Sequence, residues 1–107
     1  MLGVDPATAV ATLRQSGAAV VGCNCEVTAE DMAPLVAELA GLNGGPTVAQ
    51  PNAGQPRLEG ETTVYAETPE HFASIVVRFP GDGAGIVGGC CGTTPEYIAA
   101  LAAALRG

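Results

Sequence analysis

The amino-acid sequence predicts an α/β fold in which helices alternate with parallel strands in the order α-β-α-β-α-β-α. Four segments begin with an oxygen-bearing capping residue and continue with apolar residues spaced three and four apart, as amphipathic helices require. Three short apolar runs lie between them and show no polar alternation. Such runs are typical of strands buried on both faces of a parallel sheet. Helices that join successive parallel strands imply right-handed crossovers.

The four predicted helices share a strong start signal. The capping residues are Asp5, Thr28, Thr68 and Thr94. A proline follows the cap in three of the four segments, where its missing N–H and fixed φ suit the first helical position. Carboxylates also occupy the first turn in three of them, where they interact favourably with the helix dipole. Each signal places a helix start directly after its capping residue.

The three predicted strands span residues 18–21, 47–50 and 84–87. Glycines next to these runs are suitable helix terminators, as Gly17 is before the first. Residues 51–67 are predicted to form one long loop, because they contain two prolines and two glycines. Loops of that length within a small domain are often functional.

The composition describes a single small domain spanning residues 1–107, with 48% hydrophobic residues to build a core. A formal charge of −7 argues against nucleic acid and anionic membranes as partners. No apolar run approaches the roughly 20 residues that span a bilayer, and the N-terminus lacks the features of a secretion signal. We therefore expect a cytoplasmic protein with reduced cysteines.

The unusual residues of the chain follow the predicted strands. Cys23, Asn24 and Cys25 come after the first strand, Asn52 comes after the second, and the run 88–92 (Gly-Gly-Cys-Cys-Gly) comes after the third. The carboxyl ends of parallel strands meet at one edge of a sheet, where α/β proteins place their ligands. The three placements together predict a functional site at that edge.

Clustered cysteines in a reducing compartment indicate metal binding or thiol chemistry. Cys90 and Cys91 are adjacent, and adjacent cysteines seldom bridge each other without strain. Three thiolates suit a tetrahedral zinc site and leave the fourth position open to a substrate, as in catalytic zinc sites. A substrate thiol entering that position would be deprotonated. The glycines around the pair permit the backbone turn that such a site needs.

Other interpretations of the cysteines remain open at this point. Cys23 and Cys25 share a strand face if the strand continues, which would permit a closed four-cysteine structural site. The thiols could also be buried without a ligand, or act as redox groups. Asn52 suits either a turn or a pocket. His71, near the start of the third helix, is expected on the helix surface rather than in catalysis.

Several motifs resemble the homocysteine S-methyltransferase family. They are GCNC at 22–25, QPNAG at 50–54, TVYAETPEHF at 63–72 and GGCCGTTP at 88–95. The family includes betaine–homocysteine methyltransferase and the homocysteine-binding module of cobalamin-dependent methionine synthase. The similarity runs from about residue 3 to the C-terminus, and the vicinal cysteine pair is its most specific part.

The resemblance implies a function and a set of site residues. It implies zinc-dependent methyl transfer to the thiol of homocysteine, giving methionine. The donor would be methylcobalamin charged from methyltetrahydrofolate, betaine or a methylsulfonium compound. The metal ligands it implies are Cys25, Cys90 and Cys91, with Cys23 left as a non-ligand. The substrate-binding positions it implies are Asn24, Asn52, Gly89 and Thr93. It implies no catalytic residue beyond the zinc ligands.

The resemblance covers only part of the family fold. The family domain is a (β/α)₈ TIM barrel, and this chain supplies its last three strands. The earlier strands carry the acidic groups that hold the homocysteine amine, and nothing here takes that role. Three parallel strands cannot close a barrel, so both sheet edges would be open. We expect the chain to be active with a partner that supplies the N-terminal barrel half or through self-association, or to be a non-catalytic zinc-binding fragment.

Overall fold

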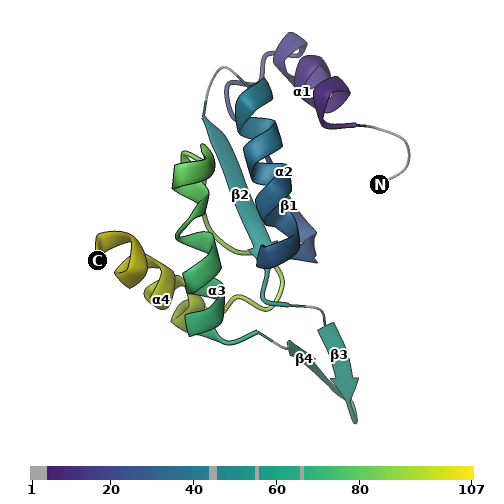
Figure 1. Ribbon diagram of the computed structural model, residues 1–107. Helices are drawn as coiled ribbons and strands as arrows, with labels where there is room; N and C mark the ends of the chain where they lie inside the picture. The colour runs from purple at the N-terminus through teal and green to yellow at the C-terminus, as the bar shows by residue number, and fades with distance from the viewer. Residues whose placement is uncertain (1–4, 44–45, 55, 66) are drawn as a thin grey trace.

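A computed structural model describes residues 5–43, 46–54, 56–65 and 67–107 of the chain. The elements in chain order are α1 (Pro6–Gln15), β1 (Val21–Thr28), α2 (Ala29–Leu42), β2 (Thr47–Asn52), β3 (Pro56–Glu59), β4 (Thr62–Tyr65), α3 (Pro69–Val76), the 3₁₀ helix η1 (Phe79–Asp82), β5 (Ile86–Val87) and α4 (Pro95–Arg106) (Figure 1). Three of the strands form a parallel sheet with the order β1-β2-β5. The predicted α/β class with a parallel sheet is confirmed.

All four predicted helix starts are confirmed, because each α-helix begins directly after its capping residue. The side-chain oxygens of Asp5, Thr28 and Thr68 each accept a hydrogen bond from the backbone N–H three residues further on. Thr94 differs, since its hydroxyl donates to the carboxylate of Glu96 and makes no such bond. Side-chain capping bonds therefore account for three of the four helix starts.

The predicted boundaries of the strands were less accurate. β1 begins at Val21, where the predicted strand of residues 18–21 ends. The reason is the end of α1: Gly17 adopts φ 99°, and the N–H of Ala18 donates to the carbonyl of Leu13 at 3.0 Å. This helix-terminating motif uses a backbone group that a strand would need. Cys23 and Cys25 consequently lie within β1 and not after it.

The other two strands also differ from their predicted spans. β2 continues past residue 50 to Asn52, which is its last residue. β5 contains only Ile86 and Val87, because the N–H of Ala84 donates to the carbonyl of Phe79 and closes η1. The predicted strand at 84–87 is therefore too long by its first two residues.

The prediction of one long loop over residues 51–67 is wrong. Strands β3 and β4 form an antiparallel hairpin within it, with Glu59 opposite Thr62. Gly60 turns the chain between them with φ 65°. Figure 1 shows this hairpin extending from the body of the molecule beyond the end of β2. Leu58 on the hairpin is 74% exposed.

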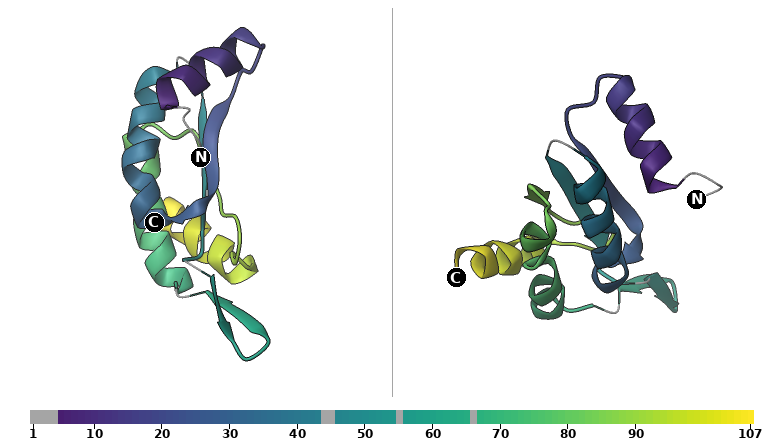
Figure 2. Two further views of the ribbon diagram at one scale, coloured as in Figure 1. Left: turned by 90° about the vertical axis from the view of Figure 1, so that its right-hand side faces the viewer. Right: turned by 45° about the horizontal axis from the view of Figure 1, so that its top comes forward.

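Helices cover one face of the parallel sheet. Figure 2 shows α2 and α3 on the same side of β1 and β2. The strand residues on that side include Val21, Thr47 and Ala49, which are buried, whereas their neighbours Gly22 and Gln50 on the other face are exposed. The prediction that the strands are buried on both faces is wrong for this chain. The uncovered face also carries Ile86, which is 49% exposed.

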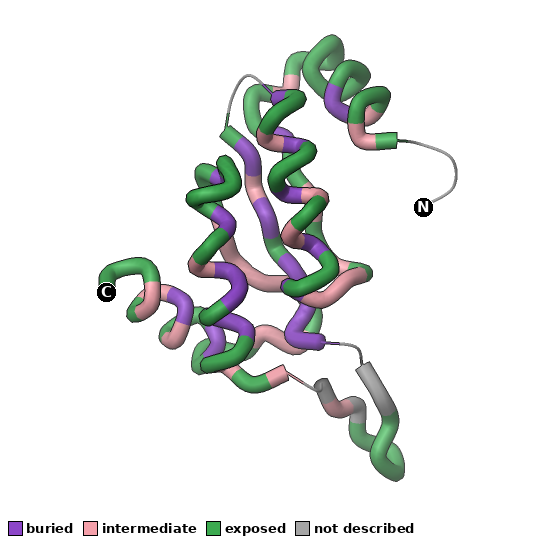
Figure 3. The backbone as a smooth tube through the Cα atoms, in the orientation of Figure 1, coloured by how far each residue is buried: buried purple, intermediate pink, exposed green. Residues whose placement is uncertain are grey.

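The core lies between this helical layer and the sheet. Its largest fully buried side chains are Phe72, Phe79, Met32, Val36, Val76, Thr47 and Pro51. A smaller cluster of Val10, Val21 and Leu39 lies beneath α1. Figure 3 shows the buried residues of α2, α3 and β2 gathered along the surfaces where these elements meet. Within the described residues, no helix combines the length and apolar character needed to cross a bilayer.

Candidate metal centre

Three cysteine sulfurs converge at the carboxyl end of the sheet. The Sγ atoms of Cys25, Cys90 and Cys91 all lie within 4.8 Å of one another, and those of Cys25 and Cys91 are 3.4 Å apart. Thiolates bound tetrahedrally to zinc at about 2.3 Å lie about 3.8 Å from each other. The three sulfur atoms are therefore spaced so that one such ion fits among them with small adjustments. Cys23 does not belong to this group.

Cys25 reaches the cluster because β1 bulges at this point. Asn24 pairs with Gln50 and Thr28 with Asn52, so three residues of β1 lie opposite the single residue Pro51. The carbonyl of Pro51 accepts from the N–H of Cys90, so the backbone of Pro51 bonds on the side of β2 that faces away from β1. A bulge bends its strand and redirects the side chains on it.

The bulge also separates the two cysteines of β1. Cys25 and Glu26 adopt the left-handed conformation, with φ of 60° and 59°. Cys23 precedes the bulge and packs against both core clusters, where burial raises the pKa of its thiol. The strand does not continue regularly between them, so the shared face that a four-cysteine site requires is absent here.

The loop that carries Cys90 and Cys91 is fixed to the end of β2 by three hydrogen bonds. The N–H of Cys90 donates to the carbonyl of Pro51 at 2.8 Å, and the N–H of Cys91 donates to Oδ1 of Asn52 at 3.0 Å. The N–H of Ala53 in turn donates to the carbonyl of Cys91 at 2.9 Å. Asn52 is buried, so its amide acts as a fixed support for the cysteine pair.

The same loop turns back on itself through Thr93. The hydroxyl and the N–H of Thr93 both donate to the carbonyl of Cys90, at 2.6 and 3.1 Å. Gly89 lies so close that a Cβ atom there would be 2.4 Å from Cγ2 of Thr93. Gly92 has φ 82°, which glycine adopts without strain. Gly89 and Thr93 thus shape the loop; contact of either with a substrate stays a prediction.

The three thiols influence one another's ionisation. Hydrogen bonding with Cys90 and Cys91 lowers the pKa of Cys25, and a hydrogen bond with the Glu26 backbone acts in the same direction. Interactions with Cys25 and Cys90 raise the pKa of Cys91 to about 11. The amide nitrogen of Asn24 also lies 3.8 Å from Sγ of Cys90, within reach for a weak N–H···S bond. A cation bound by all three sulfurs has to displace their protons, so its binding depends on pH.

Two features of this part of the molecule are not predicted by the sequence: the bulge of β1 and the carboxylate partners of His71. The bulge depends on the register of β1 against β2. Nε2 of His71 lies 2.9 Å from a carboxylate oxygen of Glu30 and 3.2 Å from one of Glu67. Its half-exposed ring links the first turns of α2 and α3, which is the surface role expected for it.

We expect Asn52→Ala to lower the free energy of unfolding of the zinc-free protein by about 1–3 kcal/mol, because the part-buried N–H of Cys91 loses its acceptor. Urea titration in the presence of a chelator measures this change. Gln50→Ala on the exposed face of the same strand is the matched control and should stay within about 0.5 kcal/mol of wild type. Equal stabilities for the two variants would show that Asn52 does not support the loop.

Comparison with known proteins identifies related sequences and a related structure. A family model described as homocysteine S-methyltransferase matches residues 1–105. Methionine synthases of Mycobacterium leprae and Mycobacterium tuberculosis are 33% and 32% identical over 106 residues, which is 98% of this chain. The crystal structure of the homocysteine methyltransferase MmuM from Escherichia coli, in its metallated form, aligns with a TM-score of 0.72 and 30% identity over 94% of this chain. The aligned region is 9% of each methionine synthase and 30% of the Escherichia coli chain.

Proposed function

The chain belongs to the homocysteine S-methyltransferase family, and we propose that it provides the zinc-binding, thiol-activating part of such an enzyme. The reaction would transfer a methyl group to the sulfur of homocysteine and give methionine. The observation that carries this proposal is the convergence of three cysteine sulfurs within 4.8 Å at the carboxyl end of a parallel sheet. The metallated state of the related Escherichia coli structure supports a metal at this position.

Each residue of the cluster has a distinct part in the proposal. Cys25, Cys90 and Cys91 would hold the zinc and leave its fourth position for the substrate. Bound zinc supplies a Lewis acid that lowers the pKa of a coordinated thiol, so that homocysteine reacts as a thiolate near neutral pH. Oδ1 of Asn52 accepts a hydrogen bond from the N–H of Cys91, and the side-chain amide of Asn24 lies beside Sγ of Cys90.

A second candidate function is a zinc-binding fragment or split subunit that needs a partner. The uncovered face of the sheet supports it, because a closed barrel would bury that face. In this case β1-β2-β5 would form the last three strands of a TIM barrel, and an N-terminal barrel half or a second copy of the chain would provide the rest. The domain assignment for residues 1–107, the cytoplasmic location, and methylcobalamin or methyltetrahydrofolate on a partner module all stay predictions.

We expect the zinc-loaded chain to bind homocysteine and not homoserine, because a hydroxyl in place of the thiol is a poor zinc ligand. Isothermal titration of each compound into the 107-residue protein measures the difference. Zinc binding without homocysteine binding would contradict thiol activation by this chain and favour the split-subunit candidate. The molecular mass from size-exclusion chromatography with light scattering then distinguishes two cases. A mass above that of one chain indicates self-association, and the mass of one chain indicates that a different chain is needed.

A further inference from the structure

Two consecutive residues of the β1 bulge have an unfavourable backbone conformation. Cys25 and Glu26, with φ of 60° and 59°, are the non-glycine residues with positive φ in the described part of the chain. A Cβ atom makes this left-handed region unfavourable, although asparagine enters it more easily and glycine does so freely. The conformation therefore has to be stabilised by other contacts around the bulge.

The β-ladder does not provide that stabilisation. Pairing with β2 is interrupted between Asn24 and Thr28, so the bulge lies outside the regular backbone hydrogen bonds of the sheet. The close long-range contact at this point is made by the sulfur of Cys25, 3.4 Å from that of Cys91. The backbone conformation of Cys25 and Glu26 therefore depends on where the sulfur of Cys25 lies. A metal ion that binds this sulfur would strengthen the dependence.

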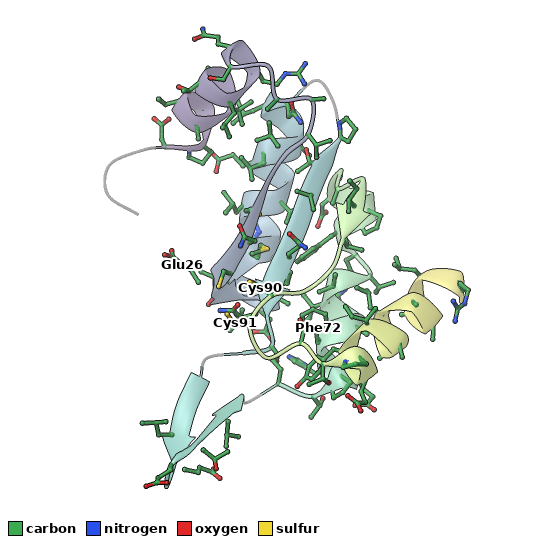
Figure 4. All side chains as sticks on the ribbon, turned by 180° about the vertical axis from the view of Figure 1, so that it is seen from behind. Glu26, Phe72, Cys90 and Cys91 are labelled. Carbon is green, nitrogen blue, oxygen red and sulfur yellow. The ribbon has the colours of Figure 1, made fainter. Side chains whose placement is uncertain are left out.

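The side chain of Glu26 does not explain the conformation. Figure 4 shows it on the outer side of β1, directed away from the labelled Cys90 and Cys91, and it is exposed. Its carboxylate is not part of the cluster of possible ligands in the described residues. The contribution of residue 26 to the site is therefore made through its backbone.

We propose that Glu26 is a positioning residue whose left-handed backbone conformation forms together with metal binding and directs Sγ of Cys25 at the Cys90–Cys91 pair. The identity of residue 26 then sets the zinc affinity through the ease with which its backbone enters this conformation. This inference rests on the proposed zinc site and adds a determinant of affinity that is not itself a ligand.

Four substitutions in the full 107-residue protein test the inference, with zinc affinity measured by competition against a chromophoric chelator. Glu26→Gln removes the charge and leaves the preference for the left-handed conformation nearly unchanged, so its zinc affinity should be within about twofold of that of wild type. Glu26→Asn and Glu26→Gly should bind about three- to tenfold more tightly, because the left-handed conformation is easier for them. Glu26→Val should bind at least about tenfold more weakly, because β-branched residues rarely adopt it.

A purely structural role for residue 26 gives a different result. In that case Cys25 and Glu26 already have their left-handed conformation in the zinc-free protein. The substitutions would then change the free energy of unfolding measured with chelator present and leave the zinc affinity unchanged. That outcome would overturn the inference. Equal zinc affinities for wild type and all four variants would overturn the inference about Glu26 and leave the proposed zinc site intact. A wild-type protein that binds no zinc would overturn the proposed function as well.

Discussion

Cys91→Ser is expected to remove stoichiometric zinc from the purified protein, with an affinity loss of more than about 100-fold. Even residues that only support metal ligands change affinity by about 10- to 100-fold when they are mutated. Serine replaces a soft thiolate with a hydroxyl that does not ionise near neutral pH, and leaves two sulfur ligands where three converge. Zinc content per chain, measured by elemental analysis after dialysis against limiting chelator, gives the result directly.

Cys23→Ser is the matched control for this experiment, because Cys23 lies on the same strand and outside the cluster. Its zinc content should equal that of wild type. Zinc lost from Cys23→Ser, or kept by Cys91→Ser, would contradict the three-cysteine site. Titration of the thiols distinguishes a metal-binding role of the cysteines from a redox role. Thiol reactivity that is the same with and without chelator would exclude a metal role for the cluster.

Phe72→Ala is expected to lower the free energy of unfolding by about 3–5 kcal/mol. The ring of Phe72 on α3 is fully buried and meets the ring of Tyr97 on α4 edge to face, with centroids 5.5 Å apart. A chain of this size has a total stability of about 5–15 kcal/mol, so the variant would retain little of it. Loss of this contact also weakens the packing of α4, which directly follows the cysteine loop.

Urea denaturation followed by circular dichroism measures this effect, with Ile98→Ala as the control. Ile98 lies on α4 beside Tyr97 in sequence but is 45% exposed, so its truncation should change stability by less than about 1 kcal/mol. Similar losses for the two variants would show that the α3–α4 contact does not carry the stability assigned to it.

The sequence was informative about helices because their starts depend on local chemistry. The oxygens of Asp5, Thr28 and Thr68 satisfy N–H groups three residues away, and neighbours in sequence suffice to predict that. The hairpin of β3 and β4 had a local signal as well. Gly60 stands first in a two-residue turn between the strands, which is a known hairpin pattern, but the prolines of the segment favoured a loop.

The end of the sheet where the cysteines gather was also predictable, since it follows from strand direction alone. The bulge that turns Cys25 toward the pair was not, because it depends on the register of β1 against β2. Register is a property of two segments brought together by folding. From the residues alone, Cys23 and Cys25 were therefore equivalent candidates, and the family resemblance distinguished them.

The separation of the cluster's residues along the chain has a consequence for how the protein forms. Cys25 and Cys91 are 66 positions apart, so a metal ion that joins them closes a loop that contains every element from α2 to β5. As a cross-link in the unfolded chain, a closure of this length removes conformational entropy worth about 4 kcal/mol. The complete set of ligands exists only after residue 91 has been synthesised. A metal ion bound by all three sulfurs would therefore join β1 to the loop after β5 only once every element between them has been synthesised.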